Sequence, residues 1–356
     1  MSLPFLNKFK KTLDKLETVY TTFGAPDFWY STGNYAVNKI MSGSFTKGIP
    51  QGRITCLAGP SGAGKSFLLC NILRDAQKQG AFVLVLDSEN ALDENFMSAI
   101  GIDTSPDKLM YVGVTLFSDV VSVISEFIQN YEKEYGKDNP NAPKVVIALD
   151  SLDMLLTDSE EQHFNSGVQK GDQGQRAKQA KHMLRTTVAR IKRLPMSFLV
   201  THQVYANSDL LNGEGNWIVN NAIRYSASQI LLITKLKLRE AGEVLGIRMR
   251  VECFKSRFAK LGSRVEVEVP YTKGMSPYSG FLDLMEEAGI VTSAGAWKTL
   301  VMPDEQIKFQ SKQLDEKLVE KMLSHPKITG EEIAITSLIE TMSDDPEQEM
   351  QSEALL

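Results

Sequence analysis

Cysteine, long apolar runs and a surplus of positive charge are all scarce in this 356-residue chain. The three cysteines, Cys56, Cys70 and Cys253, have no metal-ligand spacing, so we expect buried, reduced thiols. No apolar run reaches the length that crosses a bilayer, and the lysine-rich start lacks the apolar core of a secretory signal. We therefore expect a soluble, cytoplasmic protein with no membrane partner.

The net charge of the chain does not by itself indicate nucleic-acid binding. The 39 Lys and Arg residues face 44 Asp and Glu residues, which gives a formal net charge of −5 at pH 7. Any binding of a polyanion must therefore depend on local basic patches. The hydrophobic content of 42% and the charged content of 23% are ordinary for a globular protein.

A glycine-rich stretch follows a predicted buried strand at residues 54–57. It fits the spacing Gly-x-x-x-x-Gly-Lys-[Ser/Thr] of a phosphate-binding P-loop. A helix predicted over residues 65–79 would place its N-terminus against the phosphate. The lysine would reach the terminal phosphates, and the serine hydroxyl would ligate Mg²⁺. The predicted nucleotide-binding residues of this loop are Gly59, Pro60, Ser61, Gly62, Ala63, Gly64, Lys65 and Ser66.

Two more apolar runs, residues 82–86 and 145–149, are typical of strands buried on both faces of a parallel sheet. Glu89 follows the first run closely, and Asp150 follows the second directly. Carboxylates at these strand ends would lie on the same edge as the P-loop. We expect Asp150 to hold Mg²⁺ and Glu89 to activate the attacking water. A solvated acid at a strand end is the alternative interpretation of Glu89.

A basic window and two glycine-bearing loops lie between residues 159 and 221. Residues 170–193 hold eight Lys and Arg residues against one acid. The polar stretches 159–175 and 207–221 predict two long loops, which together could clamp a strand of nucleic acid. A solvated helix face is the alternative interpretation of the basic window. His202, at the end of a strand predicted over residues 197–201, is interpreted as a hydrogen-bonded core residue.

The remaining segments flank this predicted core. Residues 4–22 have the spacing of an amphipathic helix that packs on its own core or on a neighbouring subunit. Alternating residues in 247–254 and 264–269 predict an antiparallel hairpin, with Lys255 and Arg257 at its turn. Those cations are either solvated or reach a neighbour's phosphate. Helical patterns at 314–323 and 331–339 precede an acidic tail, 343–356, that we expect to be disordered.

Over about residues 30–300, these motifs resemble the RecA family of strand-exchange recombinases, and most closely the UvsX-type recombinases of phages. The resemblance rests on the P-loop and on four other segments, Ser31-Thr32-Gly33, residues 86–93, Leu149-Asp150-Ser151 and Arg176-Ala177-Lys178. Two residues depart from it: His202 stands where RecA commonly has asparagine, and Asn38 stands where the family has aspartate. The region after about residue 305 has no clear counterpart in the bacterial C-terminal domain.

The resemblance implies an α/β fold, a RecA-like P-loop NTPase core with a mostly parallel sheet, an added antiparallel hairpin, a short N-terminal helix and a small C-terminal extension. The expected domains are an N-terminal helical oligomerisation segment (1–30), the ATPase core (31–300), a small helical region (301–342) and the acidic disordered tail (343–356). The implied function is an ATP-dependent recombinase that forms helical filaments on single-stranded DNA. It would catalyse homologous pairing and strand exchange with duplex DNA.

Cofactors, partners and residue roles follow from the same resemblance. ATP and Mg²⁺ are the implied cofactors, with Ser66 and Asp150 at the metal. The implied catalytic residues are Glu89, Lys65, the switch residue Gln203, and Lys255 and Arg257 acting on the ATP of an adjacent protomer. The implied additional ATP contacts are Phe96, Asp150 and Tyr278. The expected DNA-binding residues are Lys170, Arg176, Lys178, Val204, Tyr205, Asn207, Asn220, Asn221 and Arg224. The implied partners include a single-strand-binding protein and a loader or mediator, in a host cytoplasm if a phage encodes the chain.

Three alternatives stay open at this point. One is a hexameric RecA-fold helicase. Such helicases usually carry an N-terminal domain, for which the roughly 30 residues before the predicted core leave little room. A filament scaffold or mediator would use ATP binding for assembly and hydrolyse it only incidentally, against which Glu89 argues. A signalling ATPase without a DNA ligand is disfavoured by the basic window.

Overall fold

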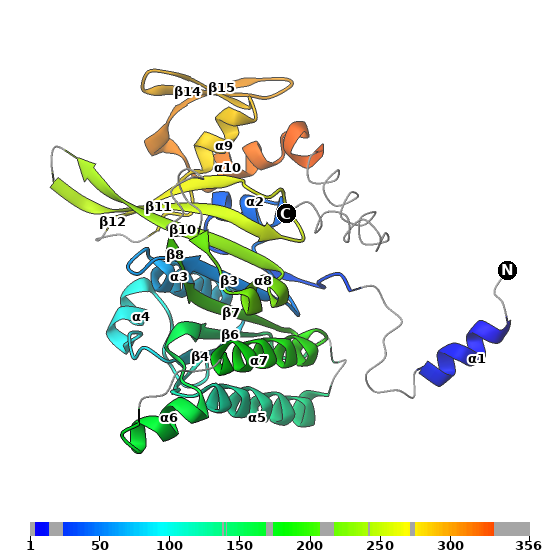
Figure 1. Ribbon diagram of the computed structural model, residues 1–356. Helices are drawn as coiled ribbons and strands as arrows, with labels where there is room; N and C mark the ends of the chain where they lie inside the picture. The colour runs from blue at the N-terminus through cyan, green and yellow to red at the C-terminus, as the bar shows by residue number, and fades with distance from the viewer. Residues whose placement is uncertain are drawn as a thin grey trace.

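The computed structural model describes residues 4–13, 24–136, 139, 141–168, 174–206, 217–240, 243–270 and 275–330. A central sheet is formed by β3 (Ile54–Gly59), β4 (Phe82–Asp87), β5 (Leu109–Gly113), β6 (Val145–Asp150), β7 (Met196–Gln203), β10 (Gln229–Glu240), β11 (Glu243–Ser256) and β12 (Arg264–Pro270). Their order in the sheet is β12-β11-β10-β3-β7-β6-β4-β5 (Figure 1). The strands from β10 to β5 are parallel, whereas β11 and β12 are antiparallel additions at one edge. The predicted parallel sheet with an added hairpin is confirmed.

Burial follows the sequence pattern of each strand. Every residue of β3 and β6 is buried, as continuous apolar runs require when helices cover both faces of a sheet. In β12 the valines point inward, and the charged residues between them stay near solvent. Cross-strand ion pairs join Arg248 to Glu268 at 2.7 Å and Arg250 to Glu266 at 2.9 Å on the outer face of the hairpin.

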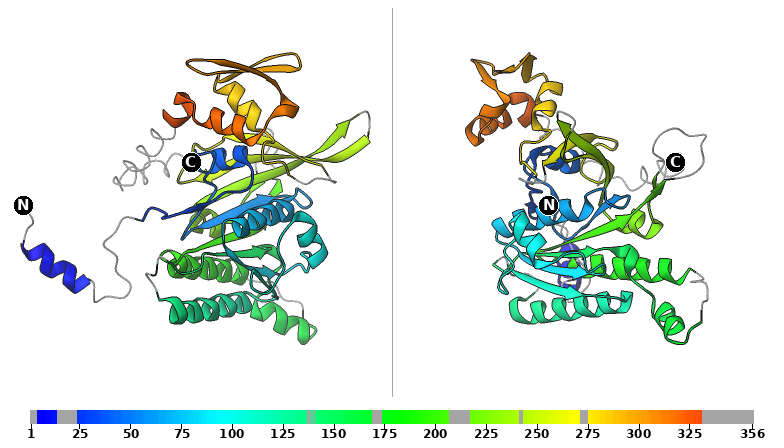
Figure 2. Two further views of the ribbon diagram at one scale, coloured as in Figure 1. Left: turned by 180° about the vertical axis from the view of Figure 1, so that it is seen from behind. Right: turned by 90° about the vertical axis from the view of Figure 1, so that its left-hand side faces the viewer.

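Helices cover the two faces of the sheet in separate groups (Figure 2). One apolar cluster contains residues of α2 (Tyr35–Ser42), α3 (Lys65–Lys78) and α4 (Glu94–Ile100). The other contains residues of α5 (Phe117–Tyr135), α7 (Gln175–Ile191) and α8 (Asn221–Ser226). The expected P-loop helix is therefore present as α3.

Short elements shape the loops around this sheet. The 3₁₀ turn η1 (Leu152–Met154) follows β6, and α6 (Asp158–Asn165) begins with a capping box on Thr157. Strands β1 (Trp29–Tyr30) and β2 (Ile49–Pro50) pair near the chain's entry into the core. Strands β8 (Tyr205–Ala206) and β9 (Trp217–Ile218) pair at the two ends of the second predicted loop.

The C-terminal part has its own apolar cluster, which includes Phe281, Leu300, Phe309, Val319 and Met322. Its elements are α9 (Phe281–Glu287), β13 (Val291–Ala294), β14 (Trp297–Val301), β15 (Gln306–Gln310), η2 (Ser311–Gln313) and α10 (Glu316–Leu323). Helix α10 confirms the helical pattern at 314–323. Strand β15 was not expected in a helical region and forms because alternate residues of it pack inward. The segments 331–339 and 343–356 lie outside the described residues.

Helix α1 (Pro4–Leu13) stands apart from the sheet in Figure 1 and in the left-hand view of Figure 2. Its apolar side is open to solvent, with Phe5 at 62% and Phe9 at 54% exposure. The predicted helix is thus confirmed over its first half, and residues 14–23 are outside the described residues. In the described part of the chain, the helices are all too short or too polar to span a bilayer.

Candidate nucleotide and DNA site

The predicted nucleotide site lies at one edge of the sheet. Gly59 at the end of β3 is opposite Gln203 at the end of β7, and Asp87 at the end of β4 is opposite Asp150 at the end of β6. The strand order β3-β7-β6-β4 therefore brings the P-loop, the predicted switch and both predicted carboxylate segments side by side. This is the edge at which open α/β sheets bind their ligands.

The P-loop has the tight backbone that phosphate binding needs. Gly59 approaches the carbonyl of Ile233 so closely that a Cβ would lie 2.3 Å from the oxygen. Gly64 has a φ of 99°, which favours glycine, and begins α3. The ammonium of Lys65 donates to the carbonyls of Gly59 and Pro60, each at 3.0 Å. Burial lowers the pKa of Lys65, although neighbouring carboxylates oppose the shift.

Asp150 has an oxygen that fits a metal ion. Its Oδ1 accepts a hydrogen bond from the hydroxyl of Thr201, whereas its buried Oδ2 has no hydrogen-bond partner. Burial raises the pKa of this carboxyl, and the hydroxyls of Thr201 and Ser66 close to it oppose the shift. An unpartnered carboxylate oxygen with a serine hydroxyl close by is a donor set that Mg²⁺ accepts together with water and phosphate oxygens. The predicted metal pair, Ser66 and Asp150, is thus brought together.

Glu89 is held by a turn built on Asp87. The Asp87 carboxylate accepts the backbone N–H groups of the four residues that follow Ser88, at 2.8–3.0 Å. It also accepts the hydroxyl of Tyr111, whose pKa rises to about 12 through burial and through this carboxylate. The side chain of Glu89 then accepts the hydroxyl of Ser151 at 2.5 Å. The turn therefore directs the predicted general base toward the end of β6.

Gln203 is fixed through its backbone. Its N–H donates to Oδ2 of Asp153 at 2.5 Å, and the next residue, Val204, donates its N–H to the carbonyl of Gly59 at 3.2 Å. The predicted switch is thereby tied both to η1 and to the start of the P-loop. His202 is a buried, hydrogen-bonded residue, as expected, with its Nδ1 2.9 Å from Oδ1 of Asp153.

The predicted DNA-binding residues are distributed around α7 and α8. Lys178, Tyr205, Asn221 and Arg224 are exposed, Asn220 caps α8, and the side chain of Val204 is buried. Arg176 is partly held by the protein, since its guanidinium donates to the carbonyl of Asp153 at 2.8 Å and to Glu160 at 3.0 Å. Lys170 and Asn207 lie outside the described residues.

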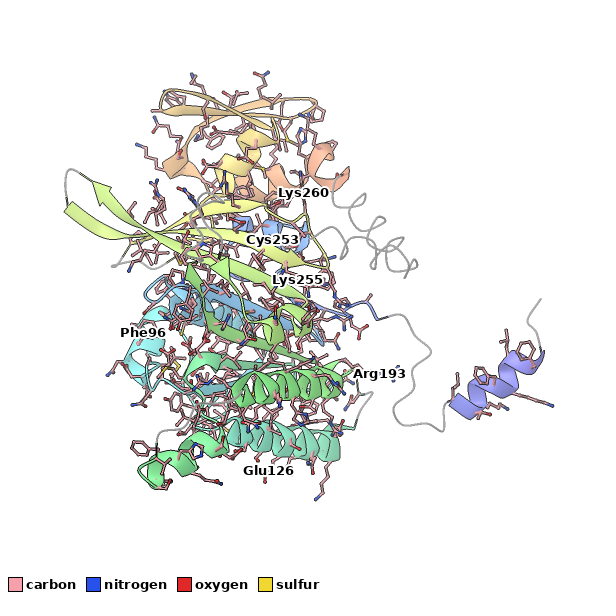
Figure 3. All side chains as sticks on the ribbon, in the orientation of Figure 1. Phe96, Glu126, Arg193, Cys253, Lys255 and Lys260 are labelled. Atoms are coloured by element: carbon pink, nitrogen blue, oxygen red, sulfur yellow. The ribbon has the colours of Figure 1, made fainter. Side chains whose placement is uncertain are left out.

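Two predicted ATP contacts come from different elements. Phe96 lies on α4 (Figure 3), partly buried against the first apolar cluster. Tyr278 precedes α9 and stacks on Tyr35, with the ring centroids 6.0 Å apart. The side-chain amide of Asn34 holds this second loop by donating to the carbonyls of Ser276 and Ser279 at 2.9 and 3.0 Å.

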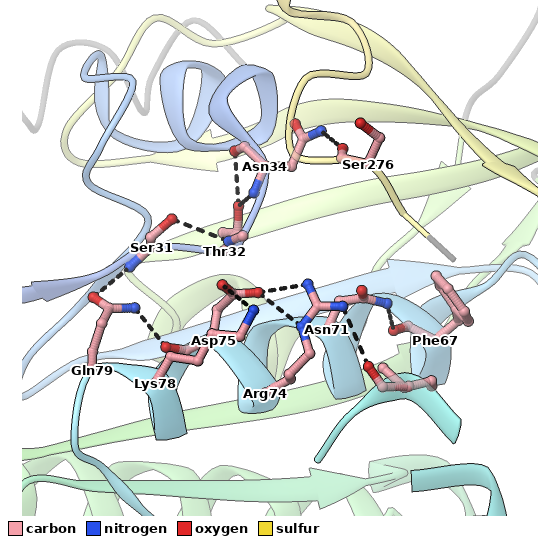
Figure 4. A network of polar contacts seen from close by, with 12 residues as sticks. Ser31, Thr32, Asn34, Phe67, Asn71, Arg74, Asp75, Lys78, Gln79 and Ser276 are labelled. Carbon is pink, nitrogen blue, oxygen red and sulfur yellow. Dashed lines mark hydrogen bonds and ion pairs between the residues drawn. The ribbon is translucent and has the colours of Figure 1, made fainter. Parts of the chain in front are cut away.

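A polar network joins the Tyr278 loop to the P-loop helix (Figure 4). Residues 31–34 lie against the C-terminal half of α3, where the N–H of Ser31 donates to Gln79 at 3.2 Å. Gly33 leaves room for Asp75, whose carboxylate is also bound by Arg74 at 2.7 Å. The Ser-Thr-Gly segment therefore ties the start of α2 to α3.

Lys255 and Arg257 lie away from the P-loop of their own chain. Lys255 lies opposite Ile230 of β10, which in turn lies opposite Cys56 in the middle of β3. The N–H of Arg257 donates to the carbonyl of Ser228 at 3.1 Å, and the N–H of Ser228 donates at 2.9 Å to the carbonyl of Ile54, where β3 begins. The P-loop leaves the other end of β3. The ammonium of Lys255 donates to the carbonyl of Arg224 in α8. In Figure 3, Lys255 and Phe96 accordingly lie well apart.

The roles of Thr201, Ser151 and Asp153 were not predicted from the sequence. Their hydrogen bonds hold Asp150, Glu89 and Gln203, respectively. Each is a polar residue in or just after a core strand, and this is a signal too common to single them out. Lys235 of β10 was also missed, and its ammonium lies beside Gly62 at the tip of the P-loop.

A P-loop, a buried aspartate with an unpartnered oxygen and a hydrogen-bonded glutamate on one sheet edge are typical of nucleoside triphosphatases of the doubly wound α/β class. Comparison with known proteins places the chain within that class. A model of the RecA N-terminal domain matches residues 28–276, and the chain belongs to this family. It is a RecA-type recombinase and a DNA-dependent ATPase.

Individual relatives agree with the family match. The protein RecA of Oleidesulfovibrio alaskensis is 27% identical over 259 residues, which cover 70% of this chain and 68% of the relative. The protein RecA of Syntrophus aciditrophicus is 27% identical over 258 residues, covering 70% and 69%. That of Desulforapulum autotrophicum is 26% identical over 275 residues, covering 75% and 72%. The expectation of a RecA-family member is therefore confirmed.

Proposed function

We propose that the chain assembles as a helical filament on single-stranded DNA, with ATP and Mg²⁺ between adjacent protomers, and pairs that strand with homologous duplex DNA. The observation that carries this proposal is that, within one protomer, Lys255 and Arg257 lie away from Lys65. Both cations lie away from the end of β3 that carries the P-loop, which supports a role for them at the ATP of a neighbouring protomer.

The residues of one protomer supply most of the chemistry. Lys65 turns from the loop carbonyls toward the terminal phosphates, while Ser66 and Oδ2 of Asp150 hold the metal. When bound, Mg²⁺ neutralises charge that develops on the phosphate oxygens. Glu89, oriented by Ser151, accepts a proton from the attacking water, and Gln203 senses the γ-phosphate. Phe96 contacts the adenine, and Tyr278 packs against the nucleotide.

The DNA ligand is proposed to run along the exposed residues near the two loops. Lys178 and Arg224 contribute charge, and Tyr205 contributes a ring on which a base stacks. Because such contacts are mainly to the backbone, affinity falls steeply with salt and depends little on sequence. We also propose that the chain is of the UvsX-like subtype and is cytoplasmic, in the host if a phage encodes it. Its proposed partners are a single-strand-binding protein and a loader. The proposed domain limits are 1–30, 31–300, 301–342 and 343–356.

The decisive test mixes two inactive variants. Lys65→Ala removes the P-loop cation, and the double variant Lys255→Ala/Arg257→Ala removes the cations proposed to act on the neighbour. Mixed filaments then contain some sites with every group intact, so DNA-stimulated hydrolysis in the mixture should exceed that of either variant alone. The matched control is Lys260→Ala, an exposed lysine after β11, mixed in the same way. A mixture no more active than its parts contradicts the shared site, and hydrolysis indifferent to single-stranded DNA contradicts the proposed function.

A further inference from the structure

The carboxylate of Asp153 holds two groups at the end of β7. Its Oδ2 accepts the N–H of Gln203 at 2.5 Å, and Nδ1 of His202 lies 2.9 Å from Oδ1 and 3.1 Å from Oδ2. On the other side of the ring, Nε2 of His202 accepts the N–H of Asn220 at 3.1 Å. A ring nitrogen that accepts carries no proton, so the single proton of the neutral imidazole lies on Nδ1 and is donated to Asp153.

The chain of contacts continues into α8. Asn220 caps this helix, with its Oδ1 accepting the N–H of Ala222 at 2.8 Å. The carbonyl of Arg224 in the same helix accepts the ammonium of Lys255. The backbone carbonyl of Asp153 accepts the guanidinium of Arg176, at the start of α7. One residue of η1 is therefore bonded to the predicted switch, to the basic helix α7 and, through His202, to α8.

We propose that Asp153 and His202 are positioning residues that couple the nucleotide state at Gln203 to α8. The inference rests on the switch role given to Gln203 in the proposed function. Because His202 is only 4% exposed, no bulk water replaces a broken bond, and a shift of the Gln203 N–H is passed to the imidazole and then to Asn220.

The relay needs a carboxylate at position 153, because this group accepts hydrogen bonds both from the N–H of Gln203 and from Nδ1–H of His202. In Asp153→Asn, an NH₂ group replaces one of the two accepting oxygens. In one orientation of the amide, this NH₂ faces the N–H of Gln203. In the other orientation, it faces Nδ1–H of His202. The imidazole escapes the second conflict only by moving its proton to Nε2, where it opposes the N–H of Asn220. The substitution keeps the shape of the side chain and breaks the relay.

Trp217 reports on the relay without DNA. It lies in β9, before Asn220, with its ring packed on the second apolar cluster. The other two tryptophans, Trp29 and Trp297, are replaced by phenylalanine, and Mg²⁺ with a non-hydrolysable ATP analogue is titrated. The emission of Trp217 should change in this parent chain. At saturating analogue, the change should be at least about fivefold smaller in Asp153→Asn.

A second readout is the ratio of single-stranded DNA affinities measured with the analogue and with ADP. This ratio should fall about tenfold in Asp153→Asn, with the affinity in ADP unchanged. His202→Asn keeps a donor to Asp153 and loses the acceptor for Asn220, whereas His202→Gln does the reverse. Both should lower the ratio, and combining either with Asp153→Asn should lower it no further, since the pair acts as a unit.

Asp315→Asn is the matched control, because Asp315 caps α10 in the C-terminal part, far from the relay, and asparagine also caps helices. Three outcomes would overturn the relay: a full change in Trp217 emission in Asp153→Asn, no change in the parent chain, or an equally reduced change in the control. A response in the parent without DNA-stimulated hydrolysis contradicts the proposed function and leaves the relay standing. If Asp153→Asn does not fold, the two His202 variants, which keep the carboxylate, decide in the same assay.

Discussion

The hydroxyl of Ser151 donates a 2.5 Å hydrogen bond to Oε1 of Glu89, joining the ends of β6 and β4. Ser88 braces the same junction, since its hydroxyl accepts the N–H of Ser151 at 2.9 Å and donates to the carbonyl of Ser151 at 2.7 Å. The glutamate proposed as general base is therefore positioned from the strand that carries Asp150.

Removing this contact should slow hydrolysis without removing the base. We expect Ser151→Ala to lower kcat by about 10- to 100-fold through misplacement of Glu89. Glu89→Gln should lower it by about 10²- to 10⁴-fold, with ATP affinity largely retained in both. Steady-state ATPase assays with saturating DNA measure both. Ser118→Ala, which removes a similar hydroxyl–carboxylate bond to Asp158, should leave kcat unchanged; an equal loss there would refute the positioning argument.

Asp150 should make the nucleotide-free protein less stable as the pH rises. The pKa of this carboxyl is raised in the folded state, so the folded protein binds its proton more tightly than the unfolded chain. The resulting stabilisation is present at low pH and is lost as the pH rises through the raised pKa. Asp150→Asn should therefore increase the melting temperature in chelator more at pH 8 than at pH 4, and should abolish hydrolysis. An equal increase at both pH values would contradict this explanation.

Asn38 should not tolerate the aspartate that the family resemblance leads one to expect. Its Oδ1 accepts the N–H and the hydroxyl of Thr32, both at 2.8 Å, and its Nδ2 donates to Ser31 and to the carbonyl of Phe45, both at 2.9 Å. A carboxylate would face the Phe45 carbonyl with no proton to donate. Asn38→Asp should cost about 1–3 kcal/mol in the free energy of unfolding. Urea titration at pH 7 measures this cost, with exposed Asn141→Asp as the neutral control.

Tyr205 and Lys178 should affect DNA binding in different ways. Tyr205 is 63% exposed beside the second loop, and Tyr205→Ala should cost about 1–3 kcal/mol by removing a stacked base, with the salt dependence unchanged. Lys178→Ala should reduce the salt slope of log K by about one. Fluorescence anisotropy over a salt series separates the two. Lys133→Ala on α5, away from both loops, should change neither quantity; a reduced slope there would contradict the assignment to α7.

Helix α1 should control self-association. Its exposed Phe5 and Phe9 offer an apolar surface that no described part of the same chain covers in Figure 1. Phe5→Ser/Phe9→Ser should shift the sedimentation profile toward monomers in the presence of ATP and DNA. The melting temperature should be nearly unchanged, because these side chains are already exposed. An unaltered profile would contradict the assignment of α1 to the interface.

Much of the core could be predicted from local patterns. The P-loop between a buried strand and α3, the acids after β4 and β6, and the hairpin of β11 and β12 each depend on residues close together in sequence. Strand β15 and the apolar cluster of the C-terminal part were missed because their packing partners are distant along the chain. The relay of Asp153, His202 and Asn220 could not be predicted for the same reason, since its members come from three separate segments.

The sequence alone determined that this protein carries groups suited to binding a nucleotide. The chemical properties of the P-loop glycines, the lysine and the strand-end acids do not depend on the order of the strands in the sheet. Only the tertiary structure decided which groups share a site. Strand order put Gln203 and Asp150 beside the P-loop, whereas the antiparallel direction of β11 carried Lys255 away from it. Strand direction and register are set by long-range packing, which no local pattern of residues contains.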